Sequence, residues 1–163
     1  MITQDYLKTI LNYDKETGEW TWKIKKGTRA LVGNKAGTLD NTGYIHIAID
    51  RKVYQSHRLV WLYIYGKFPA EFLDHINNIK HDNSLKNLRE CTRQQNGINR
   101  GNQSNNTTGF KGVCWKESLK KYTVRCTYQG KRVHLGCFTL LEDAAKAYEI
   151  FSRKHHKGFH YDN

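Results

Sequence analysis

Four polar residues with complementary chemistry lie between positions 74 and 96 of the sequence. Asp74 and His75 are adjacent, and Asn87 and Asn96 follow. A histidine has an ordinary pKa of about 6.5, which suits a general base near neutral pH. The Asp74 carboxylate and the Asn96 carboxamide are oxygen donors that suit Mg²⁺ or Mn²⁺, and Asn87 could hold the imidazole or a loop in place. Such a set could activate water for attack on a phosphodiester.

The flanking sequence predicts the elements that position these side chains. It indicates a short strand, a polar loop and a second short strand, over residues 72–76, 77–84 and 87–91. Thr92 and Gln95, three residues apart, form a capping box, which predicts that a helix begins there. Asn96 would lie in the first turns of this helix and face back toward Asp74 and His75.

The segments around these residues carry a family resemblance. They are Ser-His-Arg-Leu-Val-Trp, Leu-Asp-His-Ile-Asn, Asp-Asn-Ser-Leu-Lys-Asn-Leu-Arg and Thr-Arg-Gln-Gln-Asn. Together they resemble the HNH endonucleases, in the form common among phage and intron-encoded homing endonucleases. The resemblance implies that His75 is the general base, Asn87 the middle asparagine, and Asp74 and Asn96 the protein ligands of a single metal ion. Asn96 stands where the family pattern ends in histidine, which favours Mg²⁺ or Mn²⁺ over zinc.

Each of these residues also has an ordinary structural interpretation. An isolated Asp-His pair is usually part of a surface loop, and single asparagines are more often turn or cap residues. His57 lies in the His-Arg-Leu segment but outside the metal-binding spacing. We interpret it as a structural histidine, with a supporting role in the active site as the alternative.

The composition points to a polyanionic partner. The 163-residue chain has a net charge of +12 and a pI near 9.6. Its excess of lysine and arginine is concentrated in residues 1–70 and 109–163, which favours double-stranded DNA as the partner. A membrane surface is the alternative. However, no segment approaches the roughly 18 apolar residues of a membrane span, and the N-terminus lacks a signal-peptide core. We therefore expect a cytoplasmic protein, in a bacterial host cell if the gene belongs to a phage.

The N-terminal part of the chain predicts small antiparallel hairpins and two helices. We expect a helix, a hairpin, a second hairpin and a second helix, over residues 4–11, 12–23, 44–55 and 58–65. Basic residues on these strands could contact the DNA backbone, or they could form a solvated edge. The four cysteines show no Cys-x-x-Cys spacing, which indicates neither a zinc ribbon nor a disulfide framework.

Residues 97–109 are rich in asparagine, glycine and serine, which predicts a linker. Arg100 in this stretch could contact a phosphate. Beyond the linker we expect strands over residues 111–115, 121–128 and 131–135, followed by a helix whose capping box is Thr139 and Glu142. Alternation along the second strand predicts one apolar face, which the helix would cover, and one basic face.

This last region resembles the AP2 DNA-binding domain. The likeness rests on Gly-Phe-Lys-Gly-Val, on Val-His-Leu-Gly-Cys-Phe and on Glu-Asp-Ala-Ala-Lys-Ala-Tyr. In that family the sheet enters the major groove, which implies DNA contacts for Lys111, Arg125, Thr127, Arg132 and His134. Plant members usually have arginine at position 114 and glutamate at position 125, so their base preference does not transfer. A solvated basic surface is the alternative, and Trp115 could be a core residue or a stacking contact.

The sequence therefore predicts an α+β protein that combines an HNH unit of the ββα-metal type with a small three-stranded antiparallel sheet packed on one helix. The expected regions are an N-terminal DNA-contacting region, the nuclease unit, a linker and the AP2-like domain, over residues 1–55, 56–100, 101–108 and 109–163. We expect a monomer that nicks duplex DNA with one divalent cation and no small-molecule cofactor. The alternatives are a DNA-binding regulator with an inactive HNH unit and a structural nucleic-acid binder without sequence preference.

Overall fold

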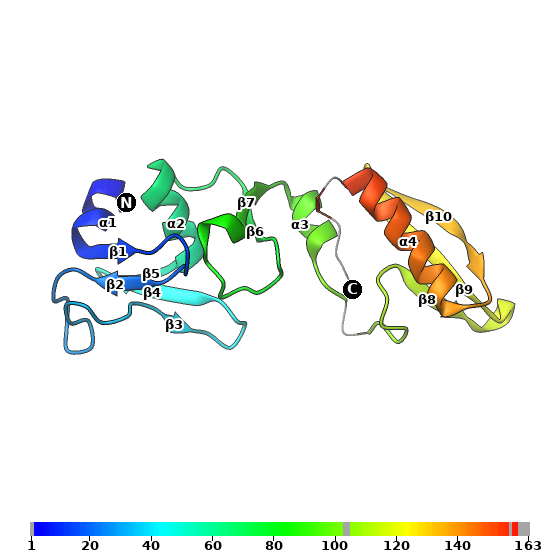
Figure 1. The fold of residues 1–163 in the computed structure, drawn as a ribbon, viewed down its shortest axis with the longest axis horizontal. Helices are drawn as coiled ribbons and strands as arrows, with labels where there is room; N and C mark the ends of the chain where they lie inside the picture. Colours follow the sequence, from blue (N-terminus) through cyan, green and yellow to red (C-terminus); the bar gives the residue numbers. More distant parts are fainter. Residues whose placement is uncertain (1, 103–104, 157, 160–163) are drawn as a thin grey trace. The chain divides into compact units, whose positions relative to one another are not determined.

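The computed structural model describes residues 2–102, 105–156 and 158–159 of the chain. It has an α+β fold in which small antiparallel sheets alternate with helices, as the sequence predicted (Figure 1). The chain divides into two compact units, residues 1–92 and 93–163. Helix α3, which the sequence analysis assigned to the nuclease unit, falls in the second of these.

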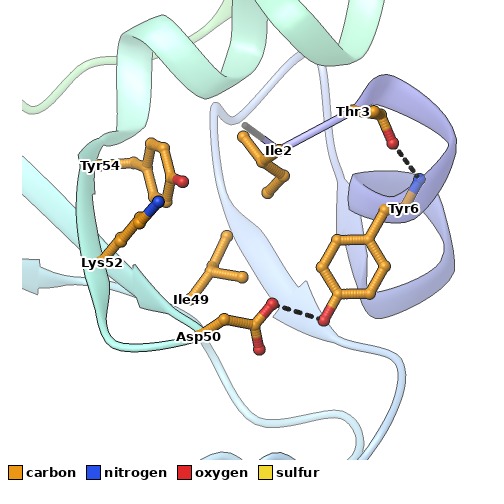
Figure 2. Close-up of a pocket in the computed structure, with 7 residues that line it drawn as sticks. All are labelled: Ile2, Thr3, Tyr6, Ile49, Asp50, Lys52 and Tyr54. Carbon is orange, nitrogen blue, oxygen red and sulfur yellow. Dashed lines mark hydrogen bonds between the residues drawn. The ribbon is translucent and has the colours of Figure 1, made fainter.

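The first unit begins with helix α1 (Gln4–Ile10) and a hairpin of β1 (Leu11–Tyr13) and β2 (Trp20–Trp22). The helix starts where the Thr3 side chain accepts a hydrogen bond from the Tyr6 backbone N–H at 3.3 Å. The Tyr6 hydroxyl then donates to Asp50 Oδ2 at 2.7 Å, which ties α1 to the turn of the following sheet (Figure 2). The predicted helix and hairpin are therefore confirmed.

A three-stranded sheet follows, in the order β3 (Thr38–Leu39), β4 (Ile45–Ile49), β5 (Lys52–Gln55). The sequence predicted the β4–β5 hairpin but not β3, which is only two residues long. Helix α2 (Ser56–Tyr65) begins directly after β5, two residues earlier than predicted. This early start places the side chains of Ser56 and His57 inside the unit, where both are buried.

The hairpin that carries the Asp-His pair consists of β6 (Phe72–His75) and β7 (Leu88–Cys91), close to the predicted bounds. Asp74 lies opposite Arg89 in the register, and His75 lies opposite Leu88. A 3₁₀ turn, η1 (Leu85–Asn87), leads into β7 and contains Asn87. The residues between the strands form a loop that contains Asn83.

One hydrophobic core holds the whole first unit together. It contains side chains from α1, β1, β2, β4, α2, β6 and β7, among them Leu7, Trp20, Ile47, Leu59, Val60, Leu73 and Leu88. Trp20 is 1% exposed, and its ring contacts those of Tyr13 and Tyr63 at centroid distances of 4.8 and 5.4 Å. The N-terminal hairpin therefore packs in the same core as the hairpin that carries Asp74 and His75.

The second unit contains α3 (Arg93–Asn99), β8 (Val113–Lys116), the 3₁₀ turn η2 (Glu117–Leu119), β9 (Lys121–Tyr128), β10 (Lys131–Phe138) and α4 (Leu141–His156). The sheet is antiparallel in the order β10–β9–β8. Strand β9 has the predicted bounds, β8 begins two residues later than predicted, and β10 runs three residues further through a register shift between His134 and Gly136.

Helix α4 covers the apolar face of this sheet, as predicted (Figure 1). The core of the unit joins Ala144 and Tyr148 from α4 to Val113, Val124 and Cys126 from the strands. All four cysteines of the chain lie in strands, and all four are free.

Candidate active site

The loop between β6 and β7 is held in shape by Asn87. Its Oδ1 accepts a hydrogen bond from the Asn77 backbone N–H at 3.0 Å, and its Nδ2 donates to the Asp82 carbonyl at 2.7 Å. The Asp82 carboxylate in turn accepts from Asn77 Nδ2 at 2.7 Å and from the Ser84 hydroxyl at 2.7 Å. Of the two roles expected for Asn87, to hold the imidazole or to hold a loop, these hydrogen bonds are those of a residue that holds the loop.

His75 lies under this loop and is 6% exposed. Its Nε2 is 3.1 Å from Asn83 Oδ1, and Asn83 Nδ2 donates to Ser56 Oγ at 3.2 Å. Because the amide nitrogen of Asn83 is already a donor, its oxygen must accept, so the shared proton belongs to His75 Nε2. This tautomer places the imidazole lone pair on Nδ1. Burial lowers the pKa of His75, while the bond to Asn83 and the charge of Asp74 oppose that shift.

A second buried imidazole, His57, lies beside His75. The two rings meet edge to face at a centroid distance of 5.2 Å, and the Tyr44 ring lies 5.5 Å from His57 and 6.0 Å from His75. Burial lowers the pKa of His57 to about 3. Within the described part of the chain, His57 Nδ1 has no hydrogen-bond partner. His57 is therefore a buried, neutral side chain that packs against His75, which agrees with its interpretation as structural.

Asp74, the residue expected to bind metal, contacts a guanidinium. Its Oδ2 accepts hydrogen bonds from Arg89 Nε at 2.9 Å and from Arg89 Nη2 at 2.7 Å. Successive side chains of a strand point to opposite faces, so Asp74 meets Arg89 while His75 meets Asn83. The carboxylate is 6% exposed. An ion at this carboxylate would have to compete with Arg89.

Asn96, the second expected metal ligand, lies in α3 of the second unit and is half-buried. A carboxylate and a carboxamide are hard oxygen donors, so the chemistry of this pair fits Mg²⁺ or Mn²⁺. Among the described residues, no group of three or more His, Cys, Asp or Glu side chains is close enough to hold a metal ion. The carboxamide of Asn96 is outside that set of residue types.

Four of the expected DNA-contacting residues lie together on the sheet of the second unit. Arg125 and Thr127 of β9 pair across the strands with His134 and Arg132 of β10. All four are exposed, and they share the face opposite the core. They therefore form one polar, basic surface, which we call the β9–β10 surface.

Lys111 lies elsewhere. It precedes β8, and its Nζ donates to the carbonyls of Ile98 and Arg100 at 2.5 Å each. Burial lowers its pKa to about 8. Lys111 thus binds the C-terminal end of α3 and the residue that follows it, whereas the side chain of Arg100 is exposed. Trp115 packs against Tyr122 at a ring distance of 4.8 Å, away from the β9–β10 surface.

Asn83, which contacts His75, was not among the residues predicted from the sequence to form the site. Asn83 stands in the Asp-Asn-Ser-Leu-Lys-Asn-Leu-Arg segment but was interpreted only as part of a polar loop. One signal was present: its position beside Asp82 and four residues before Asn87 within the segment that carried the resemblance.

The pocket of about 290 Å³ beside α1 and β4, shown in Figure 2, is lined by none of the predicted site residues.

Comparison with known proteins identifies the family of this segment. Residues 54–98 match the family model described as HNH endonuclease. The chain is 29% identical over 105 residues to Protein 3.8 of Escherichia phage T7, an alignment covering 64% of this chain and 87% of that protein. It is 32% identical over 126 residues to a protein of Acanthamoeba polyphaga mimivirus called an uncharacterized HNH endonuclease, covering 76% of this chain. No solved structure matches the chain.

The segment from β5 to α3 is therefore similar to HNH endonuclease domains, and Asp74, His75, Asn87 and Asn96 all lie within the matched residues. The predicted HNH resemblance is confirmed at this level, whereas the homing type and the AP2 likeness stay predictions. The aligned region spans 64% of the mimivirus protein, which is less than two thirds of its length. No helix in the described parts of the chain is both long and apolar enough to cross a membrane.

Proposed function

We propose that the chain is a metal-dependent HNH endonuclease that hydrolyses phosphodiester bonds in duplex DNA. The observation that carries this proposal is the buried His75, oriented by Asn83, inside the segment that matches the HNH endonuclease model. Burial favours the neutral imidazole, and the lone pair on Nδ1 can take a proton from water. His75 is then the general base, and hydrolysis at phosphorus leaves 5′ phosphate and 3′ hydroxyl ends.

Asp74 and Asn96 would hold one divalent cation, Mg²⁺ or Mn²⁺. When bound, such an ion polarises the phosphate and stabilises charge on the departing oxygen. Asn87 keeps the loop above His75 in place through its two backbone contacts. Arg89 balances the buried charge of Asp74 while no cation does so.

The β9–β10 surface would bind the DNA and select the site, as in AP2 domains. Its support is the exposed cross-strand arrangement of Arg125, Thr127, Arg132 and His134, together with the net charge of +12. One active site per chain cuts one strand per binding event, so a monomer of the homing type would nick duplex DNA.

The Asp74–Arg89 ion pair favours a second candidate function, a DNA-binding regulator with an inactive HNH unit. In such a protein the guanidinium would keep the carboxylate permanently and exclude a cation. The two functions differ in whether a divalent ion produces cleavage.

A plasmid nicking assay tests the proposal. Purified protein with Mg²⁺ or Mn²⁺ should convert supercoiled DNA to the open circle, and EDTA should stop the reaction. His75→Ala should abolish cleavage while leaving DNA affinity within a few-fold. His81→Ala is the matched control, because it removes an exposed imidazole of the same loop. DNA left intact with every divalent ion, but still bound specifically, would favour the regulator.

A further inference from the structure

A chain of buried hydrogen bonds runs through the first unit and ends at His75. Trp20 Nε1 donates to Ser56 Oγ at 3.0 Å, and Asn83 Nδ2 donates to the same oxygen at 3.2 Å. Asn83 Oδ1 lies 3.1 Å from His75 Nε2. Ser56 and Asn83 are 0% exposed and Trp20 is 1% exposed. The residues come from β2, the first position of α2, the loop before η1, and the end of β6.

The chemistry of the donors gives this chain a direction. An indole N–H can only donate, so Ser56 Oγ accepts from Trp20. The same oxygen accepts from the amide of Asn83, and a second acceptor, the His81 carbonyl, lies 3.4 Å from that amide nitrogen. If the Asn83 amide group were rotated by half a turn, its oxygen would face the Ser56 and His81 oxygens. A buried amide N–H would then have no acceptor, which is costly. The oxygen of Asn83 is therefore held toward His75.

The backbone of Asn83 is fixed as firmly as its side chain. The Tyr13 hydroxyl donates to the Asn83 carbonyl at 2.7 Å, and the Leu85 N–H donates to the Lys15 carbonyl at 2.9 Å. Gly18, in the turn between β1 and β2, is so close that a Cβ there would stand 2.4 Å from the Asn83 carbonyl carbon. The β1–β2 hairpin therefore packs directly against Asn83, the residue that contacts the His75 imidazole.

We propose that Asn83 is a positioning residue that selects the tautomer of His75, with Ser56 and Trp20 fixing the orientation of its amide. Its consequence for catalysis rests on the proposed function, because it assigns His75 Nδ1 as the atom that receives the proton. The selection itself is a property of the folded protein and needs neither metal nor DNA.

Nuclear magnetic resonance of the metal-free, full-length protein tests the selection. Long-range ¹H–¹⁵N spectra distinguish a protonated ring nitrogen from a bare one, and a His75→Gln variant assigns the signal among the eight histidines. Wild type should show Nε2 protonated and Nδ1 bare. Asn83→Leu, which has a similar volume but no acceptor, should give a mixture of tautomers. Asn83→Asp keeps an acceptor and should restore the wild-type signal.

Two further variants guard against a loss of folding. Asn77→Ala is the loop control, because the Asn77 side chain bonds to Asp82 and to the Ile79 N–H within the same loop. Its His75 signal should match wild type. Ser56→Ala removes one acceptor of the Asn83 amide and should give an intermediate population, which decides the question if Asn83→Leu does not fold. A wild-type tautomer in Ser56→Ala and in folded Asn83→Leu would overturn the proposal.

The kinetics of nicking of supercoiled plasmid then test the catalytic consequence. A wrong tautomer affects the chemical step, so Asn83→Leu should lower kcat by about tenfold or more and leave KM within about twofold. Asn83→Asp should recover most of the loss. A wild-type protein that cuts no DNA would refute the proposed function alone, since the spectra would still report the tautomer.

Discussion

The two buried histidines of the first unit differ in their partners. His75 bonds to Asn83 through Nε2, whereas His57 is held by packing between the rings of Tyr44 and His75. Burying a side chain with no hydrogen-bond partner among the described residues costs free energy when the side chain is neutral, and it costs more when the side chain is charged. The stability of this region should therefore depend on pH through His57, and its proposed chemistry should depend on pH through His75.

His57 should make folding sensitive to mild acid. Its pKa is about 3 in the folded protein and about 6.5 in an unfolded chain, so unfolding takes up a proton between these values. The free energy of unfolding therefore increases with pH in this window and decreases as pH falls, by up to about 1.4 kcal/mol per pH unit. Urea unfolding at pH 7 and pH 5 should show a loss of roughly 2 kcal/mol from this residue.

His57→Phe supplies the comparison, because a phenyl ring fills a similar space without titrating. Its unfolding free energy should change less between pH 7 and pH 5 than that of wild type. Equal pH dependence in the two proteins would show that another group is responsible.

Asp74 and Arg89 should be coupled energetically. Removing either one takes this ion pair away from a side chain that is partly or fully buried, and the loss of a well-buried pair costs roughly 3 kcal/mol. In a double-mutant cycle of Asp74→Ala and Arg89→Ala, measured by urea unfolding, the double variant should lose less than the two singles combined. Additive losses would mean that the ion pair contributes nothing.

The turn between β1 and β2 packs directly against the backbone of the loop that contains Asn83. Gly18 has φ +75, and a Cβ there would lie 2.4 Å from backbone atoms of Asn83 and Ser84. Backbone cannot rotate aside as a flexible side chain can. Only glycine permits this approach of the turn to the loop.

Gly18→Ala should therefore destabilise the first unit by more than the cost of a left-handed alanine, which is about 1 kcal/mol. Gly33→Ala is the matched control: its φ is +82 and nothing lies within 4 Å of the added Cβ, so it should show the conformational cost alone. Chemical unfolding of both variants gives the comparison. Similar losses in the two would contradict a steric role for Gly18.

Local patterns in the sequence predicted most elements and part of the site. Alternation and turn residues indicated the hairpins, and β9 was found with its bounds. The two-residue β3 was missed because so short a strand has no periodicity. Asn83 was missed because its partners, at positions 13, 56 and 75, become neighbours only after folding. The guanidinium beside Asp74 depends on cross-strand register, which the pattern of single strands does not fix.

At the scale of the whole molecule, positive charge should govern DNA affinity. Each lysine or arginine that touches a phosphate steepens the salt dependence of binding. Arg132→Ala should lower affinity by about 1–3 kcal/mol if the side chain reads a base, or reduce the salt slope by about 1 if it contacts a phosphate. Binding titrations at several salt concentrations distinguish the two.

Lys146→Ala is the control for charge alone, because Lys146 is exposed on α4, which covers the other face of the sheet. Its effect on affinity and salt slope should be small. An equal effect of both variants would indicate a diffuse electrostatic attraction in place of contact through the β9–β10 surface.

The common core of the first unit limits how the segment that matches the HNH endonuclease model could be moved to another protein. The family match begins at residue 54, yet Trp20, Tyr13 and the glycine turn that brace its histidine come from the preceding third of the chain. Moving the matched stretch alone into another protein would expose its apolar side chains to water and remove the contacts that fix Asn83 beside His75. An engineered chimera would have to include the β1–β2 hairpin together with the β6–β7 hairpin.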